Sequence, residues 1–360
     1  MRLASQLAPR PVDRESGITE VRAWRLREPE SKRAYTAVRV KSANGLVGYG
    51  ECGLVESSRI QAAAALVKGI PVTAFEVAAK VLAAEPVISA GIDIAMLDIA
   101  GKMAKAPVYQ VLGGPTRFKA RAYTALPPGE SWAASGYRAF SVPIPPPVSS
   151  NHGKAYINLV LAQLNALRTR LGESIDIVLD GQGLLTPGDA GAVAAAIEKF
   201  HVMWFDEPCR AANVNAIAKI SSECVTPLGF GRNGASAAEF QNLLREQAID
   251  VLRPDIGQWG ISAIRRMAAI AETYYTAVAP HHDGGPIGTA AALHLAASLP
   301  NFVIQQIPYP AAEADRKMRA EIAGATVERV TDGFAALPSG PGLGIQVDES
   351  ALAKYEEKSA

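Results

Sequence analysis

Six short apolar runs decide the fold, and each is closed by a polar residue: IVLD (177–180), MWFD (203–206), LGFGR (228–232), VLRPD (251–255), AVAPH (277–281) and FVIQQ (302–306). The closing residues follow one another every 23 to 26 positions. A strand of about 5 residues, a helix of about 12 and two short loops add to roughly that length. Each interval therefore predicts one strand–helix unit.

The segments between these runs have the apolar periodicity of amphipathic helices. They are Pro187 to Phe200, Ala212 to Ser222, Ala235 to Glu246, Ile261 to Thr273 and Pro286 to Ser298. Strands that alternate with helices in this way form a parallel sheet, which at this number of units closes into a barrel. The fold class is α/β, a modified TIM barrel of the (β/α)7β type. The closing polar residues then share the rim on which barrel enzymes carry their chemistry.

The residues around the barrel predict a second, smaller domain. Strands followed by helices in residues 1–117 indicate an α+β cap, with Asn44-Gly45 as a hairpin turn. The barrel is expected over residues 118–335, starting with a strand at Lys119. Residues 336–360 are expected to rejoin the cap with a strand at Gly344 to Val347 and a helix at Ser350 to Tyr355.

Composition limits the classes of function. The 36 basic and 35 acidic residues give a net charge of +1, which offers no electrostatic basis for binding nucleic acid or an anionic membrane. Cys52, Cys209 and Cys224 are odd in number and lack CxxC spacing, so neither disulfides nor a thiolate metal site is expected. No apolar run is long enough to span a membrane, and Met1 to Gly17 lacks the apolar centre of a signal sequence. We expect a cytoplasmic protein.

Several motifs, spread over nearly the whole chain, carry a resemblance to a known family. They are GLVGYGE (45–51), IDIAMLDIAGKMAKAPVYQVLGG (92–114), WFDEP (204–208), DVLRPD (250–255), APH (279–281) and the segment 285–302. Together they resemble the enolase superfamily, in particular its branch of mandelate racemase and acid-sugar dehydratases of the galactonate and mannonate type. The resemblance implies the barrel and cap described above. It also implies abstraction of a proton next to a carboxylate.

The resemblance implies a Mg²⁺ site that this chain carries in degenerate form. Family members hold Mg²⁺ with carboxylates that end the third, fourth and fifth strands. The matching residues here are Asp180, Asp206, which is one methylene shorter than the usual glutamate, and Arg232. A guanidinium has no lone pair for a cation. No tightly bound cofactor is therefore expected, and Mg²⁺ remains only as an implication of the family.

Charge counting suggests how the site is balanced instead. Three carboxylates with Mg²⁺ leave a net charge of −1, and two carboxylates with one arginine leave the same −1. Arg232 is expected to form a fork with Asp180 or Asp206, or to donate to a substrate carboxylate. The alternative is a weak metal site formed by Asp180, Asp206 and Glu207. Glu207 is also a candidate substrate-binding residue.

The general base is better preserved than the metal site. His281 and Asp255 end the seventh and sixth strands, where the family's His–Asp dyad lies, and a carboxylate partner fixes the imidazole tautomer. His282 should point away if the strand pleat continues, and a bulge would bring it into contact with substrate.

The other substrate-facing positions have lost charges that the family carries. Ser141 stands where branch members often carry a lysine or arginine, Gln182 where many sugar-acid dehydratases carry a histidine, and Gln306 where a glutamate contacts the substrate carboxylate. Each replacement keeps a hydrogen-bonding side chain. Chemistry that needs two bases, such as racemisation, is therefore not expected.

Three functions remain open. The first is a lyase, a dehydratase of hydroxy or sugar acids, in which His281 is the base and Arg232 replaces the metal. The second is a catalytically retired barrel that binds an acid ligand or a partner. The third is a Mg²⁺-dependent dehydratase with a rearranged site. The expected partner is a small carboxylic acid, and the family's habit of symmetric assembly leads us to expect a homo-oligomer.

Overall fold

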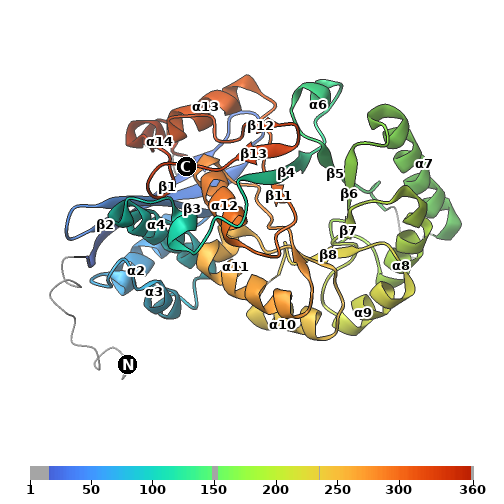
Figure 1. Cartoon of the computed structure of the whole chain (residues 1–360), viewed down its shortest axis with the longest axis horizontal. Helices are drawn as coiled ribbons and strands as arrows, with labels where there is room; N and C mark the ends of the chain where they lie inside the picture. Colours follow the sequence, from blue (N-terminus) through green and yellow to red (C-terminus); the bar gives the residue numbers. More distant parts are fainter. Residues whose placement is uncertain (1–15, 148–152, 235, 358–360) are drawn as a thin grey trace.

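The barrel is closed by the strands that the apolar runs predict. The computed structural model describes residues 16–147, 153–234 and 236–357 (Figure 1). Within them β4 to β10 pair in parallel and in sequence order, and β11 pairs with β4. A bridge between Val278 and Phe302 completes the ring. The strands are β4 (Lys119–Ala125), β5 (Ala139–Pro143), β6 (Asp176–Asp180), β7 (Trp204–Asp206), β8 (Leu228–Phe230), β9 (Val251–Leu252), β10 (Ala277–Val278) and β11 (Gln305–Gln306).

Helices follow the barrel strands in turn and surround them (Figure 1). Thr186 caps α8 by accepting a hydrogen bond from the Asp189 backbone N–H. The predicted start at Ala235 lies outside the described residues; α10 is capped by Ser236. The helices are α6 (Ser131–Ala134), α7 (Gly153–Leu171), α8 (Pro187–Ala196), the 3₁₀ turn η1 (Glu198–Phe200), α9 (Val214–Glu223), α10 (Ala237–Arg245), α11 (Ile256–Thr273) and α12 (Pro286–Ser298).

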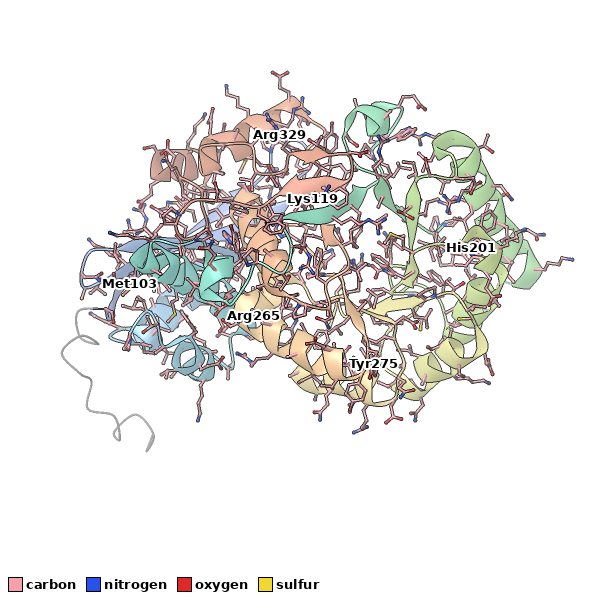
Figure 2. All side chains as sticks on the ribbon, viewed as in Figure 1. Met103, Lys119, His201, Arg265, Tyr275 and Arg329 are labelled. Carbon is pink, nitrogen blue, oxygen red and sulfur yellow. The ribbon has the colours of Figure 1, made fainter. Side chains whose placement is uncertain are left out.

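The alternation of side chains along each strand separates the two faces of the barrel wall. On β6, Ile177 and Leu179 pack outward against the helices, whereas Val178 belongs to a separate inner cluster with Trp204 and Val251. Figure 2 shows that side chains fill the space enclosed by the strands. The inside of the barrel is thus a packed core. Asp180 and Asp206, each two residues beyond an inner residue of its strand, lie at the carboxyl-end rim.

The cap has the predicted strands-then-helices order. Strands β1 (Ile18–Arg27), β2 (Ala34–Ser42) and β3 (Val47–Gly53) form an antiparallel sheet, followed by α2 (Ser57–Val67), α3 (Phe75–Val81), α4 (Pro86–Ala104) and α5 (Val108–Val111). A side chain at Gly48 or Gly50 would overlap the backbone of α4. These glycines allow β3 and α4 to pack at backbone distance, which accounts for two of the three glycines of the GLVGYGE stretch. Gly45, with a φ of 84°, lies in the turn before β3.

The C-terminal segment differs from its prediction. No strand forms at Gly344 to Val347 in the described chain, because positive φ angles at Gly342 and Gly344 produce turns. The additional elements are α13 (Glu313–Ala323), β12 (Val330–Thr331), β13 (Phe334–Ala336) and α14 (Glu349–Tyr355). The β12–β13 hairpin pairs antiparallel with β4, and α14 leads to a bridge between Glu356 and Leu26 of the cap. The domain limits at 117 and 335 stay predictions.

A buried ion-pair cluster joins the cap to the barrel. Arg319 on α13 is 1% exposed; its Nε lies 2.7 Å from Glu28 Oε1 and its Nη1 2.8 Å from Glu328 Oε1. Asp315, on the same helix, accepts hydrogen bonds from the backbone N–H groups of Glu30 and Ser31, both at 2.9 Å. Helix α13 therefore fixes the β1–β2 turn over the barrel.

We predict that Arg319→Met destabilises the protein by about 3–5 kcal/mol, since the buried carboxylates of Glu28 and Glu328 would lose the arginine that they share. Glu328 would then lack a counter-ion, whereas Glu28 would keep Arg33, whose Nη1 lies 3.0 Å from Glu28 Oε2. The matched control is Arg329→Met, because Arg329 is exposed and substitutions of exposed residues usually change stability by under about 0.5 kcal/mol. Urea unfolding of the two variants measures the difference. Equal losses in both variants would contradict this role for Arg319.

Candidate active site at the barrel mouth

Strand register brings the predicted residues to one rim. Asp180 and Asp206 are directly paired across β6 and β7, and a bridge joins Asp255 to His281. Gln306 is paired with Tyr123 across the β11–β4 ladder. Parallel strands place their carboxyl ends at the same edge, so these side chains converge at the mouth as the interval pattern predicts.

Arg232 forms the predicted fork with Asp180. Its Nη1 and Nη2 lie 2.9 and 3.0 Å from the two carboxylate oxygens of Asp180, and Nη1 lies 3.7 Å from Asp206 Oδ2. Burial acts to lower the pKa of Arg232, but the Asp180 hydrogen bonds and the Asp206 charge outweigh burial and raise it. The guanidinium is held charged at the mouth.

A second arginine, Arg253, holds Asp206, and the sequence analysis missed it. Its Nε lies 2.8 Å from Asp206 Oδ1 and its Nη2 lies 3.1 Å from Oδ2. With Arg253 included, two arginines balance two aspartates, which corrects the predicted net charge of −1 to zero. Strand alternation could have identified it, because Arg253 lies two residues before Asp255 and therefore on the same inward face.

Gln306 is tied into the same group of side chains. Its Oε1 accepts hydrogen bonds from the Tyr123 hydroxyl at 2.9 Å and from Arg253 Nη2 at 3.2 Å. The Trp204 indole N–H donates to Asp206 Oδ1 at 2.9 Å. The floor of the mouth is therefore a continuous network of polar groups, all buried except the partly exposed Gln306.

Glu207 is placed to hold the loop that carries Arg232. Its Oε1 accepts the backbone N–H groups of Gly231 at 2.8 Å and Arg232 at 2.9 Å. The Glu207 backbone has a φ of 42°, a region that non-glycine residues rarely adopt and that often marks functional positions. Burial, and then the neighbouring Asp206 charge, raise the pKa of Glu207 to about 7.

The His281–Asp255 dyad is intact. His281 Nδ1 lies 2.5 Å from Asp255 Oδ2, while Asp255 Oδ1 accepts the Gln258 backbone N–H at 2.9 Å and caps α11. Burial acts to raise the pKa of Asp255, but the His281 hydrogen bond outweighs it and the pKa lies below its usual value. A carboxylate on Nδ1 requires a proton there, so Nε2 is left as the basic nitrogen.

The remaining predicted residues differ in their access to the mouth. His282 is buried with its Nε2 at 3.1 Å from Thr289 Oγ1 of α12, so it lies behind the rim, as the strand pleat predicts. This burial lowers the pKa of His282 to about 3. Ser141 is partly exposed on β5. Gln182 is exposed, and its backbone N–H donates to Asp180 Oδ1 at 2.9 Å.

These residues, as they are arranged, do not fit a Mg²⁺ ion. Both oxygens of Asp180 and both of Asp206 accept hydrogen bonds from guanidinium groups. Mg²⁺ needs free oxygen ligands in near-octahedral geometry. Throughout the described ranges, no three His, Cys, Asp or Glu side chains are grouped so as to hold a metal. The same residues contain no helix long and apolar enough to cross a bilayer.

Two family models match the chain. Residues 129–351 match the "Enolase C-terminal domain-like" model, and residues 26–113 match the N-terminal domain of "Mandelate racemase / muconate lactonizing enzyme". The first match alone covers more than half of the chain. This protein is a member of the enolase superfamily. The matches agree with the resemblance that the motifs carry.

Enolase-superfamily relatives include named acid-sugar dehydratases. A D-galactonate dehydratase family member from Marinomonas sp. is 30% identical in an alignment of 308 positions that covers 75% of each chain. A D-mannonate dehydratase from Sphingomonas sp. is 29% identical in an alignment of 307 positions that also covers 75% of each chain. A D-xylonate dehydratase from Haloferax volcanii is 28% identical over 290 residues, 74% of this chain and 69% of that protein.

Solved structures agree on the fold. A mandelate racemase/muconate lactonizing enzyme-like protein from Roseovarius sp. superposes with a TM-score of 0.84 at 26% identity, covering 95% of this chain and 96% of that one. A mandelate racemase/muconate lactonizing enzyme from Jannaschia sp. gives a TM-score of 0.85 at 23% identity, covering 96% and 98%. The predicted modified TIM barrel with its cap is confirmed.

The raised pKa of Glu207 predicts a pH-dependent stability. The unfolded chain releases this proton near pH 4.5, whereas the folded protein keeps it until about pH 7. The contribution of Glu207 to stability is therefore fully present below pH 4.5 and is lost as pH rises to about 7. Glu207→Gln stays neutral, and its amide oxygen can still accept both backbone N–H groups.

We expect the unfolding free energy of Glu207→Gln, relative to the parent, to rise by up to about 3 kcal/mol between pH 4.5 and 7.5. Urea unfolding at several pH values measures this difference. A difference that stays constant over this range would contradict the placement of Glu207 as a buried acid.

Proposed function

We propose that the protein is a lyase that removes the α-proton next to the carboxylate of a hydroxy or sugar acid and eliminates water. In this proposal it works without tightly bound Mg²⁺. The observation that carries it is the intact His281–Asp255 dyad on the same rim as a charged arginine, Arg232. The named dehydratases among the relatives support the same class of reaction.

His281 takes the α-proton on Nε2, while Asp255 holds the proton on Nδ1 and balances the imidazolium charge. The electron pair of the C–H bond moves into the substrate carboxylate and forms an enediolate. Collapse of the enediolate breaks the bond to the β-hydroxyl, which leaves as water after accepting the proton from His281. The product is an enol that tautomerises to a 2-keto acid.

Arg232 stabilises the oxygens that gain negative charge. Nη1 and Nη2 of Arg232 each donate one hydrogen bond to Asp180, so further N–H groups of the guanidinium are available to a substrate carboxylate. Ser141, Gln182 and Gln306 supply neutral hydrogen-bonding groups for the same ligand. Glu207 positions Arg232 rather than contacting substrate, which changes the role predicted for it.

An arginine stabilises an enediolate less than a metal does. It spreads one positive charge over a planar group, whereas Mg²⁺ concentrates two at short range. The site should therefore prefer acids whose α-proton is already acidified, by a neighbouring carbonyl or by a good leaving group.

The retired-barrel function has one observation in its favour. Arg232 and Arg253 donate hydrogen bonds to Asp180 and Asp206, so both aspartates have partners within the chain. Such a barrel would bind an acid and leave its α-proton in place. The two functions are separated by proton exchange, because binding alone leaves the α-hydrogen intact.

We predict that the protein exchanges the α-hydrogen of an acid substrate with deuterated water. The panel includes D-galactonate, D-mannonate and D-xylonate, the acids named for the relatives, together with 2-hydroxy acids that carry a better leaving group than hydroxyl at C3. Proton NMR follows loss of the α-hydrogen signal. His281→Asn should slow exchange by about 10² to 10⁴-fold, as expected for loss of a general base, while binding persists.

EDTA should leave the exchange rate unchanged. The matched control is His201→Asn: His201 is exposed, has a φ of 47° that asparagine tolerates, and lies before β7 at the opposite rim (Figure 2). Exchange that requires added Mg²⁺ would support the rearranged metal site instead. Binding without exchange across the panel would establish the retired barrel.

A further inference from the structure

Arg253 is a buried arginine whose hydrogen bonds are all made within the barrel. It is 1% exposed and carries five N–H donors. Nε and Nη2 donate to Asp206, Nη1 donates to the Ala279 carbonyl at 3.1 Å and to the Tyr123 hydroxyl, and Nη2 also donates to Gln306. Every donor is used, so Arg253 has none left for a ligand.

The orientation of the Gln306 amide follows from this arrangement. An arginine can only donate, and the Tyr123 hydroxyl, which accepts from Arg253, donates its own proton to Gln306. The atom that meets both donors must be the amide oxygen, because a flipped amide would place donors against donors. Gln306 is partly exposed, so its NH₂ group is the part left for the mouth.

Both carboxylate oxygens of Asp206 also accept hydrogen bonds from within the barrel. Its Oδ1 accepts from Arg253 and from the Trp204 indole, and its Oδ2 accepts from Arg253. Removing Asp206 from this fork would leave the guanidinium buried without a counter-ion, which is costly. The carboxylate that stands at the family's second ligand position is thus a fixed counter-ion.

We propose that Arg253 is a positioning residue that withdraws Asp206 from metal binding and turns Gln306 into a hydrogen-bond donor toward the mouth. The ligand group beside Gln306 must then be an acceptor, such as a carboxylate oxygen. Arg232 alone therefore does not account for the altered metal site, because Asp206 is held by Arg253. Converting Arg232 to the family's glutamate should leave the metal site incomplete as long as Arg253 is present.

The test uses Mn²⁺, read by electron paramagnetic resonance, on the full chain. Arg232→Glu should bind Mn²⁺ weakly or not measurably, and the double variant Arg232→Glu/Arg253→Gln should bind at least about tenfold more tightly, because a further carboxylate is freed. The matched control is Arg232→Glu/Arg265→Gln, since Arg265 lies on α11 and donates to the Leu112 carbonyl (Figure 2). It removes the same charge outside the site and should bind no more tightly than Arg232→Glu.

Equal Mn²⁺ affinity of Arg232→Glu and the Arg253→Gln double variant would overturn the proposal. If the double variant fails to fold, the Mn²⁺ affinity of Arg232→Glu/Asp206→Asn is compared with that of Arg232→Glu. A loss of Mn²⁺ affinity on adding Asp206→Asn would show that Asp206 ligates despite Arg253. Unchanged affinity, or no measurable binding in either protein, is the expected result. The readout needs no catalysis, so its failure is distinguishable from failure of the proposed lyase activity.

Discussion

The mouth of the barrel depends on two guanidinium–carboxylate forks, Arg232 with Asp180 and Arg253 with Asp206. Two buried carboxylates without a counter-charge would be costly in free energy, and members of the family offset that cost with a divalent cation. In this chain two guanidinium groups balance the two carboxylates. The same forks fix where positive charge is available to a ligand, so the arginines that balance the carboxylates also limit what the site can do.

Several polar contacts join the cap to the helices that follow the last barrel strands. Helix α13 holds the β1–β2 turn through Asp315 and Arg319. Glu51 of β3 accepts the Gly285 backbone N–H at the start of α12, and burial raises the pKa of Glu51 to about 7. Asp93 of α4 accepts the Ser262 backbone N–H at 2.9 Å. The barrel residues in these contacts lie in α11 and α13 and at the start of α12, three consecutive helices, so the cap is attached along one side of the barrel (Figure 1).

Periodicity predicted the barrel because strand spacing is set by local chain geometry, and it placed the closing residues on one rim for the same reason. It failed at Gly344 to Val347, where two glycines with positive φ make turns, and it missed α13 and the β12–β13 hairpin, which lie beyond the repeat. Arg232 was found because the resemblance assigns that position a ligand. Arg253 was missed because no family ligand occupies it, although alternation from Asp255 places it inside. The partner that a buried charge selects depends on packing, which the sequence pattern does not encode.

The central claim is that arginines occupy the place of the family's metal. Inductively coupled plasma mass spectrometry of the protein, purified without chelator and dialysed against metal-free buffer, tests it most directly. We predict far less than one Mg²⁺ per chain, and no increase after incubation with millimolar Mg²⁺ followed by desalting. Close to one Mg²⁺ per chain would contradict the account, because neither Asp180 nor Asp206 could then be held in its arginine fork.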